Sequence, residues 1–374
     1  MMFSSSKIPY VLVANTFFIL LAHFVSRGAF GAIGLFEYFI VLLYLSIFLI
    51  SFYFSSFVFS LNRSKNSILI NYEEHKFSNI WLFLIFFSYI FGYVNLVGFE
   101  FNSFVELRNA LVGMYRSEDI SIEFKLVNTL GLLLFYFATY FYLVRDKNYA
   151  IYILAALTFP LLMGNRNYIL ILFQFIAYKL LIVKKKFFYI FILFCIFFIL
   201  NMLYVYLFDK GAAGVNIVAA TVISLIEYAA TPLHGLSYSL ANPQNYGDFL
   251  TIPSSLVMWL GYPVNRDFIY TPDPNPTNVY TLFFTLLYDM GVFGVAFFAV
   301  IFGTFHAYLY IKSKHNVIFL FVYIYSFYPL LMTFFDNVYT SSPGAWIYIF
   351  FPFLFFKKVR THKYNRFGYS AKLS

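Results

Sequence analysis

Long apolar runs of about 20 residues are the feature that most constrains how this chain folds. A helix needs about 20 mainly apolar residues to cross the hydrocarbon core of a bilayer, because it rises about 1.5 Å per residue. Ten such runs occur, near residues 8–26, 35–61, 80–99, 124–144, 149–164, 167–183, 187–208, 281–311, 317–335 and 344–356. Of the 374 residues, 62% are hydrophobic and 11% are charged, against roughly 25% charged in soluble domains. The sequence predicts an all-α, polytopic membrane protein with about ten transmembrane helices.

The spacing of these runs predicts a single integral membrane domain, 1–374, with one large loop at 209–280 that is rich in Pro, Asn, Gly and Tyr. The first run follows Lys7 without a small-residue cleavage site, so we expect a retained helix and not a removed signal peptide. The fifth and sixth runs are short. They could instead form one helix pair that meets around Gly164–Asn167 at the membrane surface.

Basic residues set the expected orientation, because cytoplasmic loops carry the excess of Lys and Arg. With the N-terminus inside, 18 of the 25 basic residues fall on the inner side. The other 7 fall outside, namely Arg27, Arg108, Arg116, Lys125, Arg166, Lys210 and Arg266. Both termini are therefore predicted to be cytoplasmic, and 209–280 faces outward. The net charge of +9 mainly reflects this topology and does not indicate nucleic-acid binding.

Arg166 is the most informative single charge, since it lies in the sequence GNRN between two apolar runs. A guanidinium stays protonated, so at membrane depth it must face a water-accessible cavity or bind an anion. Asn165 and Asn167 add amide donors beside a fork that matches phosphate oxygens. The alternative is an interfacial arginine that extends to lipid headgroups. Arg266, in the outer loop, is a second candidate anion ligand unless it only pairs with the adjacent Asp267.

The segment 217–240 carries the best candidates for acid and base chemistry. Glu227, Thr231, His234 and Tyr238 would share one face of a helix, but Pro232 predicts that a continuous helix is interrupted there. His234 titrates near neutrality and Glu227 could orient it, which is the arrangement of a general acid/base pair. A structural hydrogen bond between the two side chains is the alternative.

Metal and cofactor chemistry have little support in the sequence. The 6 histidines show no ligand spacing, and the single cysteine, Cys195, lies in an apolar run. There is no Gly-rich phosphate loop, and the short inner loops leave no room for a nucleotide site. We expect no metal, no cofactor and a substrate already held in the membrane.

The segment Asn275–Gly303 resembles the loop-to-helix entry of Wzy-type polymerases, the oligosaccharide repeat-unit polymerases of O-antigen and capsule assembly. The resemblance rests on the motifs NVYT (278–281) and YDMG (288–291), followed by Gly294 and Gly303. GNRN resembles the Gly/Ser-x-Arg-x helix start of the same family. Asn167 and Met290 depart from the family pattern, where a small residue and an aromatic are common. Asp289 could also simply pair with an arginine, while Gly291 and Gly294 allow close helix packing.

The resemblance implies a GT-C-like membrane glycosyltransferase in the bacterial cytoplasmic (inner) membrane. It joins polyprenyl-diphosphate-linked oligosaccharides on the outer face, in lipopolysaccharide or capsule assembly, alongside a flippase and a chain-length regulator. The implied base is His234 or Glu227, with Asp289 as a weaker candidate. The implied substrate-binding residues are Arg166, Arg266, Asn165, Asn278, Tyr280 and Tyr288.

Three other functions fit parts of the sequence. An O-antigen ligase would share the outer loop and the arginines. A transporter or flippase for lipid-linked glycans is disfavoured by the large loop and by the lack of an internal repeat. A membrane acyltransferase would need a histidine deep in the bundle, where His23 and His306 are the candidates.

Overall fold

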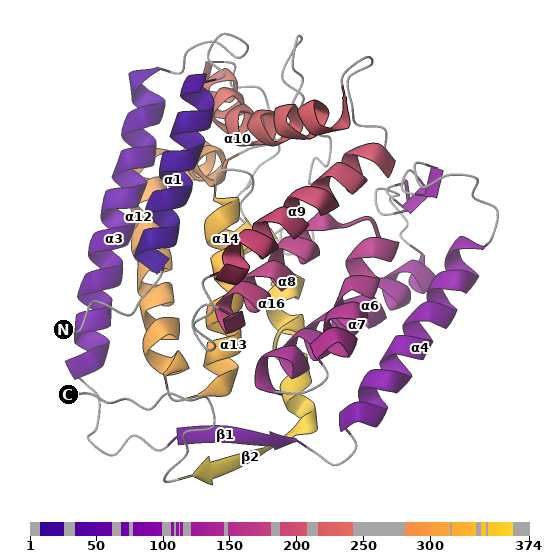
Figure 1. Ribbon diagram of the computed structural model, residues 1–374. Helices are drawn as coiled ribbons and strands as arrows, with labels where there is room; N and C mark the ends of the chain where they lie inside the picture. The colour runs from indigo at the N-terminus through magenta and orange to yellow at the C-terminus, as the bar shows by residue number, and fades with distance from the viewer. Residues whose placement is uncertain are drawn as a thin grey trace. The chain divides into compact units, whose positions relative to one another are not determined.

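The computed structural model describes residues 8–25, 34–61, 69–74, 78–98, 106–107, 110–111, 113–114, 121–145, 149–180, 188–207, 216–241, 281–314, 316–333, 338–341 and 343–361. The chain divides into two compact units, each assembled from segments that are distant in sequence. The first comprises Met1–Ser67, Val222–Lys314 and Ser326–Gly344. The second comprises Ile68–Thr221, His315–Tyr325 and Ala345–Ser374. Both consist mainly of apolar helices (Figure 1).

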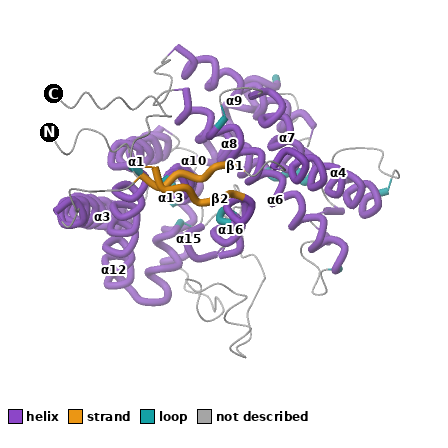
Figure 2. Tube along the Cα trace, turned by 90° about the horizontal axis from the view of Figure 1, so that it is seen from below, coloured by secondary structure: helices purple, strands orange, loops and turns teal. Residues whose placement is uncertain are grey.

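The first unit is organised around two long helices that lie side by side, α3 (Leu35–Leu61) and α12 (Leu282–Ser313) (Figures 1 and 2). It also contains α1 (Ile8–Val25), α14 (Phe327–Met332), α15 (Val338–Ser341) and most of α10 (Ile217–Ala241). Asn15 on α1 donates from Nδ2 to the carbonyls of Leu330 and Leu331, at 3.2 and 3.1 Å. These bonds add a side-chain donor to carbonyls at the end of α14, where a helix leaves its last carbonyls without intrahelical partners.

The second unit surrounds α6 (Ile122–Val144), which is buried on all sides from Gly131 to Leu143. Around it lie α4 (Ser78–Val97), α7 (Tyr149–Leu162) and α8 (Arg166–Tyr178), and the unit also holds α9 (Phe188–Leu207) and α13 (Val317–Tyr325). Most of α16 (Pro343–Tyr348) and a 3-10 helix (Phe351–Phe355) follow. The Tyr140 ring packs edge-on against Phe321 and Phe353, with centroids 5.6 and 4.9 Å apart. A helix that is apolar all round belongs in a protein core or in a membrane, and α6 is enclosed by protein.

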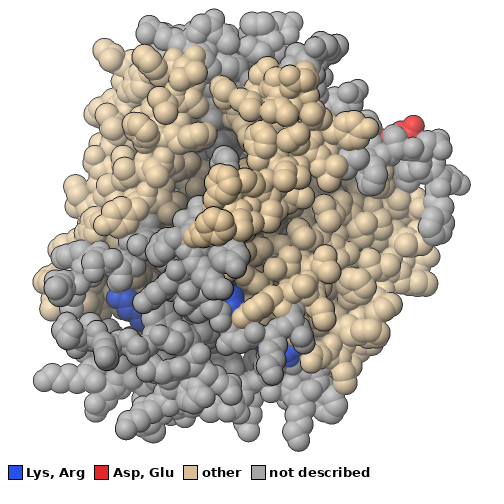
Figure 3. Space-filling view, viewed as in Figure 1, with Lys and Arg blue, Asp and Glu red and all other residues tan. Residues whose placement is uncertain are grey.

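Five helices among the described residues are long and apolar enough to cross a membrane: α1, α3, α4, α6 and α12. The described part of α9, together with α7, α8 and the stretch Val317–Met332, forms shorter apolar helices. The prediction of a helical membrane protein is confirmed at this level, and five of the ten predicted spans reach full length. The described surface in Figure 3 consists almost entirely of uncharged residues, as lipid contact requires.

Two predicted spans are not continuous helices. Residues 317–335 divide into α13 and α14 at Ser326, because Pro329 lacks the N–H that would bond to the Tyr325 carbonyl. Residues 344–356 divide into the end of α16, a turn and the 3-10 helix. Length and composition did not reveal either break.

The all-α prediction also missed one small sheet. β1 (Leu69–Glu74) pairs antiparallel with β2 (Phe356–Thr361), and the register sets Glu73 opposite Lys357. β1 lies between α3 and α4 in the chain, and β2 follows the 3-10 helix. Their pairing requires both segments to lie on the same side of a membrane, as the predicted topology has them.

Candidate functional site

The GNRN segment forms a tight, fully capped turn between α7 and α8. Gly164 has a positive φ of 61°, which an L side chain rarely adopts. The Gly164 N–H donates to the Leu161 carbonyl at 3.4 Å, and the Asn165 N–H donates to the Pro160 carbonyl at 2.9 Å. This pair of bonds is a Schellman motif, in which a glycine ends the helix and satisfies its last carbonyls.

Asn165 also begins the next helix. Its Oδ1 accepts from the Asn167 N–H at 3.1 Å, so Asn165 is the N-cap of α8. This bond explains Asn165 structurally, whereas the sequence suggested a substrate ligand. Arg166 follows as the first residue of α8, and its side chain lies outside the described part of the structure.

Aromatic side chains hold this turn in place. The Tyr168 ring packs edge-on against Phe159 and Phe135, with centroids 4.9 and 5.1 Å apart. The Tyr93 hydroxyl donates to the Leu162 carbonyl at 2.8 Å, which ties the end of α7 to α4. Arg166 is therefore carried on a backbone that is fixed from several directions.

The 217–240 segment is one continuous helix, α10, and the predicted interruption at Pro232 is wrong. Proline removes one backbone donor, but the turns on either side of Pro232 remain helical. Helical spacing therefore does place Thr231, His234 and Tyr238 along one face. Thr231 is buried, whereas His234 and Tyr238 are half-buried. The Glu227 side chain lies outside what the structure describes.

Burial determines the protonation of His234. Desolvation lowers the pKa of its imidazole below the ordinary value of 6.5. The neutral ring therefore predominates at pH 7, and only a neutral imidazole can accept a proton.

Tyr288 and Asp289 precede a break inside α12. Gly291 has φ 63° and ψ −160°, a conformation open almost only to glycine. Tyr288 is exposed and Asp289 is half-buried. Both residues thus lie at the end of a first helical segment, before the break at Gly291.

Contacts with α3 show how sharply α12 bends. The Phe283 ring centroid is 5.2 Å from that of Tyr44, and the His306 ring centroid is 5.6 Å from that of Phe48. The two α12 residues are 306 − 283 = 23 positions apart, and the α3 residues are 48 − 44 = 4 positions apart. Straight helices would separate these pairs by roughly 35 and 6 Å along their axes. The short segment 282–290 therefore folds back toward the middle of α3.

The glycines of the family-like segment have different roles. A Cβ on Gly303 would lie 2.6 Å from the Phe48 carbonyl oxygen, so this glycine lets α3 and α12 pack closely. A Cβ on Gly294 would instead meet Met290 and the Leu286 carbonyl of the preceding segment, at 2.6 and 2.8 Å. Gly291 has nothing within 4 Å of such a Cβ, so the close-packing interpretation is wrong there.

His306 is fully buried, and both of its ring nitrogens are hydrogen-bonded. Its Nε2 lies 2.8 Å from the Tyr339 hydroxyl, and its Nδ1 lies 3.1 Å from the Ser326 hydroxyl. These bonds join α12 to α15 and to Ser326, the residue that precedes α14. These bonds give His306, one of the two histidines considered for acyltransferase chemistry, a structural role in the core.

Glu37 is an ionisable residue that the sequence interpretation passed over. It lies in the first turn of α3 and is only 6% exposed. The signal was a lone carboxylate inside the apolar run 35–61. Its Oε2 folds back over the helix start, 2.7 Å from where a Gly34 Cβ would be. The positive end of the helix dipole favours a carboxylate there.

The predicted site residues fall into both units. His234, Tyr288 and Asp289 belong to the first unit, and Asn165 and Arg166 to the second. Arg266, Asn278 and Tyr280 lie outside the described residues. Within the described ranges, no three His, Cys, Asp or Glu side chains gather as a metal site would need.

Comparisons with known proteins give no relative: no family model, no curated protein and no solved structure matches this chain.

Proposed function

We propose that this chain is a glycosyltransferase that polymerises polyprenyl-diphosphate-linked oligosaccharide units on the outer face of the bacterial cytoplasmic membrane. The observation that carries the proposal is the capped turn at Gly164–Asn167, which supports an arginine at the first position of α8. Helix starts carry a partial positive charge, and their N–H groups favour anions. An arginine at such a start, within an apolar helix pair, suits the diphosphate of a lipid-borne substrate.

In the proposed reaction, a hydroxyl of one lipid-linked unit attacks the anomeric carbon of another. The new C–O bond forms as the bond from that carbon to the diphosphate oxygen breaks, and the lipid diphosphate leaves with the electron pair. The leaving group is a weakly basic anion, so cationic clamps contribute more than a strong general acid. Arg166 and Arg266 are proposed as those clamps.

The proton of the attacking hydroxyl needs an acceptor. His234 is the proposed base because its pKa is lowered, so the ring is neutral at pH 7. Glu227, seven residues earlier on α10, is proposed to orient it, with Asp289 as the weaker alternative base. Exposed Tyr288, with Asn278 and Tyr280, is proposed to contact sugar rings. Asn165, whose Oδ1 caps α8, is proposed to offer its amide group as a donor beside Arg166.

The direct test is to incubate the purified chain with lipid-linked repeat units and resolve the products by size. A ladder of multiples supports the polymerase, and unchanged substrate contradicts it. Polysaccharide banding in a deletion strain separates the polymerase from a ligase. Loss of a polymerase leaves single-unit caps on lipopolysaccharide, whereas loss of a ligase leaves none.

A flippase for the same lipid-linked glycans is the second candidate, and the interruption of α12 favours it. Transporters often bind substrate at discontinuous helices, and α12 is interrupted at Gly291. Proteoliposomes loaded with a fluorescent lipid-linked glycan distinguish the two. Transfer between leaflets without any change in glycan length would favour the flippase.

A further inference from the structure

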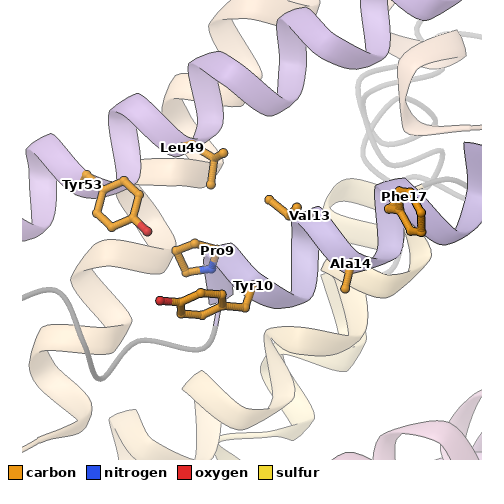
Figure 4. A pocket seen from close by; sticks show the side chains of 7 residues that line it. All are labelled: Pro9, Tyr10, Val13, Ala14, Phe17, Leu49 and Tyr53. Carbon is orange, nitrogen blue, oxygen red and sulfur yellow. The ribbon is translucent and has the colours of Figure 1, made fainter.

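A groove between α1 and α3 is a surface feature that the proposed reaction does not use. Five residues of α1, from Pro9 to Phe17, line it together with Leu49 and Tyr53 of α3, around a cavity of about 590 Å³ (Figure 4). The lining is apolar apart from the two tyrosine hydroxyls. Both helices are long and apolar enough to cross a membrane. On the predicted topology, the groove opens into hydrocarbon.

The side of α1 that lines the groove remains open. Asn15 holds α1 on α14 through the carbonyls of Leu330 and Leu331. Tyr10, Val13 and Phe17 remain 61%, 44% and 67% exposed. An unfilled gap of this kind loses dispersion contacts, which favours a mobile hydrocarbon chain as its occupant.

The groove has a polar end and an apolar end. Figure 4 shows the rings of Tyr10 and Tyr53 at one end, near the start of α1, and Phe17 at the other. Tyrosines at such positions commonly meet the headgroup level of a bilayer. Ester carbonyls and phosphate oxygens of a lipid would accept hydrogen bonds from the two phenols.

We propose that this groove binds one acyl chain of a membrane glycerophospholipid, with the headgroup beside Tyr10 and Tyr53. A water molecule occupies about 30 Å³ and a methylene group is of similar size, so about 590 Å³ corresponds to roughly 20 such groups. That matches one acyl chain and is too small for a complete polyprenyl chain. On the predicted topology, the polar end lies in the cytoplasmic leaflet, opposite the face on which the donor reacts. The site is therefore independent of the proposed reaction.

Native mass spectrometry of the full chain in mild detergent, titrated with palmitoyl-oleoyl phosphatidylglycerol, tests this site. Ala14→Trp fills the groove, whereas Leu21→Trp adds the same ring at an exposed position of α1 outside it. We expect the wild type and Leu21→Trp to retain one lipid equally. Ala14→Trp should bind it at least about tenfold more weakly, since each buried methylene contributes appreciable affinity.

A milder variant guards against misfolding. Tyr10→Phe combined with Tyr53→Phe keeps every lining ring and removes only the hydroxyls, so affinity should fall by about three- to tenfold, as expected for one or two hydrogen bonds. Equal lipid binding by Ala14→Trp and Leu21→Trp would overturn the proposal. So would a copurified polyprenyl phosphate that Ala14→Trp displaces, because it would place the donor in this groove.

Discussion

Two glycines interrupt apolar helices in this protein, and they do so in different ways. Gly164 and Gly291 have nearly the same φ, 61° and 63°. Gly164 lies in a Schellman motif whose N–H groups return to α7, and Asn165 at once caps α8. Gly291, with ψ −160°, redirects α12 and lies in open space, with nothing within 4 Å of where a Cβ would be. The first glycine closes a turn, and the second redirects a helix.

The structural effect of a glycine in an apolar run therefore depends on the hydrogen bonds and packing around it. At Gly164 the backbone groups are satisfied locally, so the turn is rigid and can hold Arg166 in one place. At Gly291 the helix changes direction, and the preceding segment folds against α3 around Tyr44 and Phe283. In the proposed reaction, the first break carries the anion-binding arginine, and the second places Tyr288 and Asp289 at the end of a helical segment.

The largest expected effect tests the first break as an anion site. Arg166→Ala should abolish polymer, because one lost electrostatic contact to a developing charge commonly costs about 10²–10³-fold in rate. Arg166→Lys should recover only part, since a point charge lacks the planar fork. Product ladders from purified enzyme give the measurement. Lys312→Ala, an exposed charge on the predicted inner side, is the control, and full-length polymer from Arg166→Ala would remove that residue from the mechanism.

The next largest effect is expected for His234→Gln, which tests whether α10 supplies the base that accepts the proton of the attacking hydroxyl. His234→Gln keeps hydrogen bonding but cannot titrate, so turnover should fall by roughly two to four orders of magnitude. Burial lowers the His234 pKa, so wild-type activity should hold as pH falls through 6.5 and decline only at lower pH, where the folded-state imidazole gains its proton. A rate–pH profile measures this. An unchanged rate and profile in His234→Gln would shift the role of base to Asp289.

The contrast between the two glycines predicts different stability losses. Gly164→Ala forces alanine into a left-handed conformation that costs about 1–2 kcal/mol. Gly291→Ala occupies a region that is nearly forbidden to side chains and should cost up to about 3 kcal/mol. Reversible unfolding in mixed micelles compares the two variants. Equal losses, or a larger loss at Gly164, would contradict the distinction drawn between the two breaks.

The smallest effect separates two roles for Asn165. As an N-cap, Asn165→Ala should lose about 1 kcal/mol of stability, while Asn165→Ser should restore it because a hydroxyl also accepts from the N3 or N2 amide. A substrate role predicts the reverse pattern in activity: serine cannot supply the amide donors, so both variants would lose polymer at equal protein levels. Thermal stability and polymer yield, measured on the same preparations, decide between the two.

Short-range chemistry made several elements predictable. The apolar runs indicated α1, α3, α4, α6 and α12 to within a few residues, because a membrane helix satisfies its own backbone hydrogen bonds. The pattern around Gly164 indicated a helix break for the same local reason. Pro232 misled the prediction, since one missing donor did not outweigh the helical turns on either side.

The sequence by itself determined that this is a helical membrane protein, and it located the ends of the five long apolar helices to within a few residues, since hydropathy and capping are local properties. Only the tertiary structure revealed the fold-back of α12 onto α3, the burial of His306 between Ser326 and Tyr339, and the pairing of β1 with β2. Each joins residues far apart in the chain. Their partners depend on how whole helices pack, and no window of the sequence contains that information.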